Sequence, residues 1–163
     1  MESAEEEEPM RGSQRVLAIV WIIAAWASAA VAAPLPPDLD AVMPPYLAMG
    51  KALAEDSLKG IPSQATAMKG LVERAGSGFF PKELPQDLDR LAKAGDLDAA
   101  RLAYKDVSDR LITLFREHKV QTGRYFVCTC PMAQASWIQA DKEIKNPYYG
   151  SAMLLCGDVT ETF

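Results

Sequence analysis

The sequence predicts a mainly α-helical protein, with a small antiparallel four-helix arrangement followed by an irregular C-terminal segment rich in cysteine and methionine. Between residues 34 and 124, apolar side chains recur at intervals of three and four positions, which is the spacing of amphipathic helices. Stretches rich in glycine and proline separate these periodic segments and indicate breaks between helices. After Gly123 the helical period is lost, and all three cysteines follow.

The N-terminal part has the features of a secretory signal peptide. Arg11 and Arg15 precede an apolar run that ends in small residues, and residues 30–32 read Ala-Val-Ala. A basic start, an apolar centre and a small-x-small end are typical of a cleaved leader. We therefore expect residues 1–32 to be a signal peptide and the protein to be periplasmic or secreted.

Two alternatives remain open for this leader. Met10 could be the true start, because the four glutamates at positions 5–8 are unusual ahead of a signal peptide. The apolar run at 16–33 could instead be a retained anchor, since it is close to the shortest helix that spans a bilayer. Its alanine-rich end and the prolines that follow favour cleavage, and no stable membrane span is then expected.

Beyond the leader, residues 33–39 form a proline-rich linker, and 40–163 are expected to be a single domain. The remaining length suits one hydrophobic core and is too short for two. The net charge of the whole sequence is −5, and the leader holds five glutamates and two arginines, which leaves −2 for the rest. Such a balance offers no basic surface for nucleic acid.

The first helix is expected within residues 38–58. Pro44 and Pro45 suit its start rather than its interior, because proline lacks the N–H that an interior turn needs. The residues expected on one side of this helix are Tyr46, Leu47, Gly50, Leu53 and Ala54.

A second helix is expected from Ile61 to Ala75. Its apolar face contains Ile61, Ala65, Met68, Leu71 and Val72. After a Gly- and Pro-rich break, residues 86–119 predict a short helix, an interruption at Gly95 and Asp96, and a long helix. Asp96 can cap the long helix by accepting from a free amide of its first turn. The long helix carries a periodic face made of Tyr104, Val107, Leu111, Leu114, Phe115 and His118.

The C-terminal segment changes character several times. Residues 124–130 are β-branched and aromatic and are expected to be extended. Residues 131–144 suggest a helical turn and a loop, and "NPYYG" at 146–150 is a turn sequence. Residues 151–157 are expected to form one or two helical turns that end at Gly157.

The five sulfur-bearing residues of this segment are candidate metal ligands: Cys128, Cys130, Met132, Met153 and Cys156. Thiolates and thioethers are soft donors, which select copper(I) and, by the same argument, silver(I). In an extended chain the sulfurs of 128, 130 and 132 share one face. In a helix the sulfurs of 153 and 156 share one side. Facing each other, the two elements would form a site of two to four sulfurs with walls from Trp137, Tyr148 and Tyr149.

Zinc is the less favoured ion. The chain has no CxxC pair and a single histidine, so a zinc site would need the three cysteines together with His118. That histidine is expected to interact with the C-terminal end of its helix instead.

Other roles for the same residues compete with metal binding. The methionines could be ordinary core residues, and Cys156 could form a disulfide with Cys130 or Cys128. Such a bridge would close a loop of about 27 residues and stabilise the fold by roughly 3 kcal/mol. An enzyme is not expected, because no Ser-His-Asp set is present and the one histidine has no candidate nucleophile near it in the sequence.

These residues carry a resemblance to a known family. The pattern comprises "CPMA" at 130–133, Trp137, Ile144, "NPYYG" at 146–150, Met153 and Cys156-Gly157. It resembles a small exported domain of unassigned function, found alone or at the C-terminal end of periplasmic adaptor subunits of heavy-metal efflux pumps. The resemblance extends over residues 40–160, and Cys128 is an addition to its pattern.

The resemblance implies a role in copper or silver handling and an efflux adaptor as a partner. The expected function is therefore an exported heavy-metal-binding domain that acts in metal handling or efflux. The alternative is a structural or interaction module, closed by a disulfide, that docks onto an efflux adaptor or another envelope protein.

Overall fold

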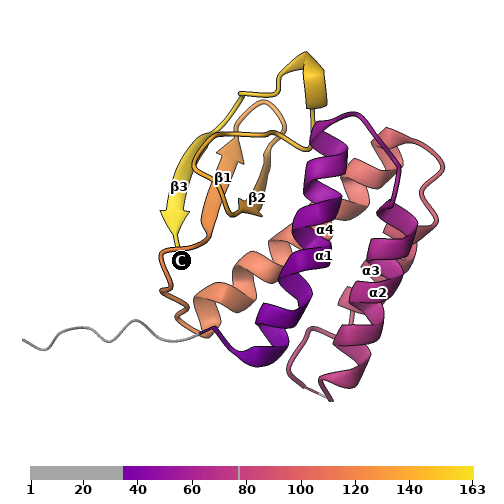
Figure 1. The fold of residues 1–163 in the computed structure, drawn as a ribbon, viewed down its shortest axis with the longest axis vertical. Helices are drawn as coiled ribbons and strands as arrows, with labels where there is room; N and C mark the ends of the chain where they lie inside the picture. Colours follow the sequence, from indigo (N-terminus) through magenta and orange to yellow (C-terminus); the bar gives the residue numbers. More distant parts are fainter. Residues whose placement is uncertain (1–34, 77) are drawn as a thin grey trace, which may run out of the picture. The chain divides into compact units, whose positions relative to one another are not determined.

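The structure is a computed structural model that describes residues 35–76 and 78–163 (Figure 1). Four helices are followed by a small three-stranded antiparallel sheet, so the protein is mainly α with some β. The expected signal peptide, residues 1–32, lies outside the described residues. Within the described ranges, no helix combines the length and the apolar character needed to cross a bilayer.

The first helix, α1, spans Pro37–Ala54 and takes in residues 37–39 of the expected linker. The expectation that Pro44 and Pro45 stand at its start is wrong, because both lie inside the helix. The carbonyls that lose a partner belong to Asp40 and Ala41, which are exposed, so water can hydrate them. Burial of one helix face outweighs the cost of the prolines. This face contains Leu39, Val42, Met43, Tyr46, Met49 and Leu53.

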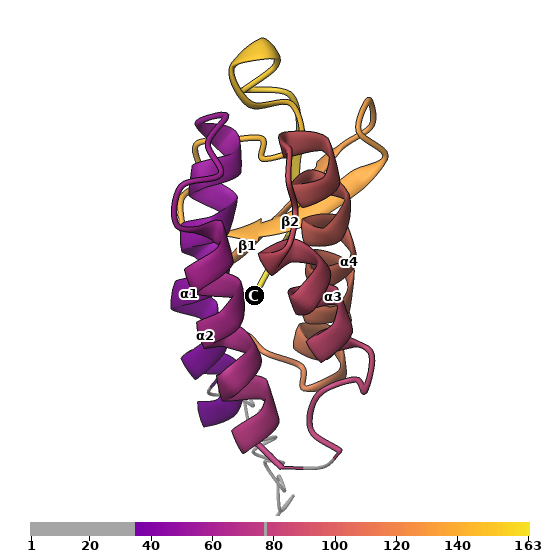
Figure 2. The ribbon, with the colours of Figure 1, turned by 90° about the vertical axis from the view of Figure 1, so that its right-hand side faces the viewer.

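The other helices follow the sequence prediction. They are α2 (Ile61–Arg74), α3 (Leu84–Ala92) and α4 (Leu97–Glu117). Asp96 caps α4 as expected, because its carboxylate accepts a hydrogen bond of 2.8 Å from the amide of Ala99. Along the chain, each helix packs against the next, and Figure 2 shows α2 beside α1 and α3 beside α4.

The sheet contains β1 (Phe126–Cys130), β2 (Ala135–Gln139) and β3 (Asp158–Thr162), in the order β2-β1-β3. The extended segment expected at 124–130 is confirmed as β1. The helical turn expected within 131–144 is wrong, because β2 pairs with β1 along its whole length. The C-terminal segment expected to be irregular is so only in part, since β1, β2 and β3 form a sheet within it. Trp137 and Ile138 are both buried, which breaks the alternation that would have marked a strand.

The hydroxyl of Tyr46 connects the helices to the sheet. It accepts a hydrogen bond of 3.0 Å from the amide of Ile138 in β2. It lies 2.8 Å from the hydroxyl of Ser108 in α4, which itself donates to the carbonyl of Tyr104. Tyr46 must therefore donate to Ser108. Every polar group in this series of hydrogen bonds then has a partner. β2 is an edge strand, so no further strand can accept a hydrogen bond from the outward-facing amide of Ile138. The Tyr46 hydroxyl accepts it instead.

Replacing Tyr46 with phenylalanine removes this connection. The buried amide of Ile138 and the hydroxyl of Ser108 then lose a partner, and we expect the free energy of unfolding to fall by about 1–3 kcal/mol. Urea denaturation measures the change. Tyr125→Phe is the matched control, and its effect is expected to stay within about 0.5 kcal/mol, because the Tyr125 hydroxyl makes no hydrogen bond to the described residues. Equal effects of the two variants would contradict the role of Tyr46.

Candidate functional site

Two of the predicted sulfur ligands meet in the structure. Cys130 ends β1, and Cys156 lies in the loop that follows the short 3₁₀ helix η1 (Gly150–Ala152). Their sulfurs are 2.6 Å apart, although the residues are separated by 26 positions in the sequence. Cys130 is buried and Cys156 is partly exposed, so the pair lies where the core meets the surface.

A tight turn after β1 surrounds the sulfur of Cys130. Pro131 interrupts the ladder, since it has no N–H to donate, and the amide of Gln134 donates to its carbonyl at 3.2 Å. Gln134 adopts a positive φ of 47°, which reverses the chain into β2. The turn directs the backbone amides of Met132 and Ala133 toward the Cys130 sulfur.

The two thiols differ in acidity. Burial acts to raise the pKa of Cys130, but hydrogen bonds from Cys156, from the two turn amides and from the side chain of Asn146 together lower that pKa. The pKa of Cys156 is raised, chiefly by its hydrogen bond to Cys130 and then by desolvation. Cys130 is therefore the more acidic thiol of the pair, and the thiolate is the form of cysteine that binds metals and reacts.

Asn146 holds the loop that carries Cys156. Its side chain is fully buried, and its Nδ2 donates to the carbonyl of Cys156 at 2.9 Å. Its Oδ1 accepts from the amides of Tyr148 at 2.8 Å and Tyr149 at 3.3 Å. The backbone amide of Asn146 donates to the carbonyl of Leu154 at 2.8 Å. One side chain therefore joins both ends of the loop. The sequence predicts only a turn at this position and gives no sign of this role.

A second group of contacts docks this loop onto the helices. Asp56, just after α1, accepts from the Arg101 side chain at 2.5 Å and from the amide of Ser151 at 2.9 Å. Arg101, in α4, also donates to the carbonyl of Pro147 at 2.9 Å. Gly150 has a φ of 53°, and a Cβ there would lie 1.9 Å from the Asp56 carboxylate. Only glycine allows this close approach. Asp56 and Arg101 were not singled out in the sequence.

The two methionines lie near the cysteine pair in sequence but not as expected in geometry. Met132 belongs to the turn rather than to a strand face, and 62% of its surface is exposed. Met153 follows η1 with an extended φ of −149°, so the helical alignment of Met153 with Cys156 is wrong. A turn replaces it, since the amide of Cys156 donates to the carbonyl of Met153 at 3.0 Å. Met153 is 37% exposed, which leaves both thioethers accessible.

The other two predicted ligands, Cys128 and His118, do not join this pair. Cys128 is fully buried in the core, and desolvation raises the pKa of its thiol to about 12. His118 forms the C-cap of α4 and stacks on Phe79, with ring centroids 4.9 Å apart. Across residues 35–76 and 78–163, no three side chains of histidine, cysteine, aspartate or glutamate gather to hold a metal ion.

The aromatic residues of the motif brace the loop against the sheet. The Tyr148 hydroxyl donates to the carbonyl of Ser136 at 2.7 Å, and the Tyr149 hydroxyl donates to that of Met132 at 3.2 Å. The ring of Trp137 packs edge-on against Tyr148, with centroids 5.9 Å apart. Both the turn at Cys130 and the loop at Cys156 are thereby fixed to one another.

Comparison of the chain with protein families, with curated proteins and with solved structures finds no match. The resemblance based on the "CPMA" and "NPYYG" motifs therefore stays a prediction.

Protonation of Asp56 at low pH should release the loop from the helices. Hydrogen bonds from Ser151, followed by Arg101, lower the pKa of Asp56 from 3.8 to about 2. A depressed pKa means that the stabilisation is complete above the unfolded pKa and is lost as the pH falls toward 2. We expect the amide resonance of Ser151 to titrate with a midpoint of about 2, as followed by NMR.

Asp56→Asn should remove this titration, because the amide side chain does not ionise. A midpoint close to the ordinary value of 3.8 in the native protein would show that the loop is not held by Asp56.

Proposed function

We propose that this protein is an exported heavy-metal-binding domain that takes up copper(I) or silver(I) through Cys130 and Cys156 and acts in metal handling or efflux. The observation that carries the proposal is the contact between the two sulfurs, 2.6 Å apart, one of which is stabilised as a thiolate by the backbone amides of the turn. Export is part of the proposal and rests on the leader sequence, and no catalytic step is assigned.

The donor set fits a soft monovalent ion. Two thiolates with accessible thioethers prefer copper(I) or silver(I), whereas a tetrahedral zinc site needs four ligands. The lowered pKa of Cys130 makes its thiolate easier to form, and an ion that binds the pair would displace protons from the two thiols. Met132 and Met153 are the available third and fourth donors, since both are exposed next to a cysteine-bearing turn.

Metal binding requires a small movement. With metal–sulfur bonds of about 2.3 Å, two sulfurs on one ion lie roughly 3.7–4.6 Å apart. The Cys130 and Cys156 sulfurs, at 2.6 Å, must therefore separate by about 1–2 Å. Cys130 is fixed at the end of a central strand, whereas Cys156 is partly exposed in a loop, so Cys156 is the donor that moves.

The short distance between the sulfurs also supports a second candidate, the disulfide-closed interaction module. Formation of the bridge releases two protons and two electrons, which a thiol–disulfide oxidoreductase outside the cytoplasm can accept. The bridge would fix the Asn146 loop to β1. Exposed apolar residues would then offer a surface to an efflux adaptor or another envelope partner. These residues include Leu102, Met132 and Leu155.

Loss of either paired cysteine should abolish tight copper(I) binding. We expect Cys130→Ser to weaken the affinity by more than the roughly 10–100-fold typical of residues that only orient a ligand. Met153→Leu should cause a smaller loss, because a thioether is a neutral donor. Titration against a copper(I) chelator of known affinity measures both. Unchanged affinity in Cys130→Ser and Met153→Leu would refute the proposal.

Cys128→Ser is the matched control and also tests the wider site expected from the sequence. Because the Cys128 thiol is buried, with a pKa raised to about 12, we expect copper(I) affinity to be unchanged in this variant. A loss as large as that of Cys130→Ser would place Cys128 among the ligands instead.

Mass measurement on freshly exported protein separates the two candidate functions. The metal-binding function predicts three thiols that can be alkylated after denaturation, or a mass increase from a bound ion under native conditions. The disulfide-closed module predicts a single alkylated thiol, Cys128, and a mass lower by two hydrogens. A bridge that persists when copper(I) is supplied in excess together with a thiol reductant would exclude the metal site.

A further inference from the structure

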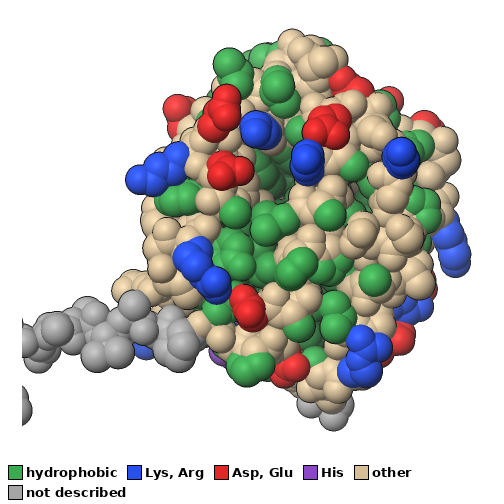
Figure 3. Space-filling view, viewed as in Figure 1, with side chains coloured by type: hydrophobic (Ala, Val, Ile, Leu, Met, Phe, Trp, Pro, Cys, Tyr) green, Lys and Arg blue, Asp and Glu red, His purple; other side chains and the backbone are tan. Residues whose placement is uncertain are grey.

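A pocket of about 380 Å³ opens between α1 and the sheet, and no cysteine lines it. Its volume lies within the range of small-molecule sites. Figure 3 shows an apolar hollow near the middle of this face, with basic and acidic side chains around it. Neither proposed function uses this pocket.

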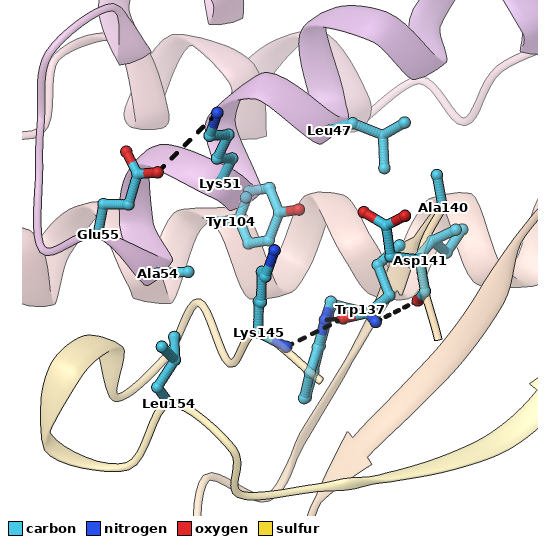
Figure 4. Close-up of a pocket in the computed structure, with 13 residues that line it drawn as sticks. Leu47, Lys51, Ala54, Glu55, Tyr104, Trp137, Ala140, Asp141, Lys145 and Leu154 are labelled. Carbon is cyan, nitrogen blue, oxygen red and sulfur yellow. Dashed lines mark hydrogen bonds and ion pairs between the residues drawn. The ribbon is translucent and has the colours of Figure 1, made fainter. Parts of the chain in front are cut away.

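The wall of the pocket is apolar and partly aromatic. Tyr104 comes from α4 and Trp137 from β2, and Leu47 and Leu154 face them from α1 and from the Cys156 loop (Figure 4). Gly50 lets Tyr104 pack closely against α1, because a Cβ there would lie 2.3 Å from the Tyr104 hydroxyl. Tyr104 and Trp137 are almost fully buried, so they close the inner end of a wall whose apolar character suits the apolar body of a small ligand.

Two basic side chains, Lys51 and Lys145, and two acidic side chains, Glu55 and Asp141, line the pocket. Lys51 is paired with Glu55 at 4.0 Å, and Lys145 with Glu143 at 3.8 Å. Asp141 also lines the pocket, and its carboxylate forms no ion pair with the residues that the structure describes. Figure 4 shows this carboxylate on the side of the pocket that Leu47 and Tyr104 form. Among the charged residues that line the pocket, Asp141 is thus the one left without an ion pair in the described part of the chain.

We propose that this pocket binds a small organic monocation with an apolar body, such as an arylalkylamine. The apolar body would lie against Leu47 and Leu154, which are partly exposed, and its ammonium group would pair with Asp141. No cysteine lines the pocket, so binding here needs no ligand from the paired thiols.

Three probes that share one ring system and differ only in charge test the proposal. These are naphthylmethylamine, naphthylmethanol and naphthylacetate, titrated into the full chain at neutral pH and followed by NMR. We expect the amine to bind with a dissociation constant on the order of 1 mM, the alcohol more weakly and the carboxylate most weakly. Shifts should concentrate on the amides of residues 139–141 and on the indole N–H of Trp137.

Two variants assign the binding to this pocket, and two others serve as controls. Asp141→Asn should weaken binding of the amine by roughly two- to fivefold and leave binding of the alcohol unchanged. Glu117→Gln, an exposed control on α4, should change the binding of neither. Ala140→Trp places a bulky ring at an exposed position of the lining and should block all three probes. Cys156→Ser should retain binding of the amine.

Binding of the carboxylate at least as tight as that of the amine would overturn the proposal, as would the absence of shifts with every probe. Rising ionic strength should weaken the binding of the amine alone, because only the amine forms an ion pair with Asp141. These outcomes do not depend on copper(I) affinity, so this site and the thiol site can each fail separately.

Discussion

The hydrogen bond from the Ile138 amide to the Tyr46 hydroxyl determines where the sheet lies on the helices. A three-stranded sheet of five-residue strands has little core of its own, and β2 depends on packing against α4 and α1. Tyr46 fixes the position of β2 along α1, because its hydroxyl must accept the hydrogen bond of the Ile138 amide and donate to the Ser108 hydroxyl at the same time. The turn at Cys130 follows from that placement, because it joins β1 to β2.

The cysteine pair is then completed by a loop held at two points. Asn146 joins the ends of the loop, and Asp56 with Arg101 attaches its middle to α1 and α4. Both attachments act on backbone groups, so they fix the path of the chain whatever the side chains around it. The turn amides near Cys130 differentiate two thiols that are alike in the unfolded chain, because they help to lower the pKa of Cys130 whereas the pKa of Cys156 is raised.

The helices could be predicted because their apolar faces and the Asp96 cap are local signals. The prolines of α1 were misplaced because burial of a helix face, a tertiary effect, overrode a local preference. β2 was missed because its strand state comes from pairing with β1. The meeting of Cys130 and Cys156 was anticipated from their clustering in the sequence, but the helical geometry assumed for Met153 was wrong. The contact between Asp56 and Ser151, which are 95 residues apart, has no sequence signal at all.

Trp137 lies between the two regions to which we assign binding. It forms part of the pocket wall, and it lies so close to Gly157 that a Cβ there would come within 2.9 Å of its ring. Gly157 directly follows Cys156. The other two tryptophans of the sequence fall before residue 34, so Trp137 is the sole indole fluorophore of the described residues. In protein that lacks residues 1–32, its emission wavelength and intensity can thus monitor, without any added label, both occupation of the pocket and rearrangement of the adjoining cysteine.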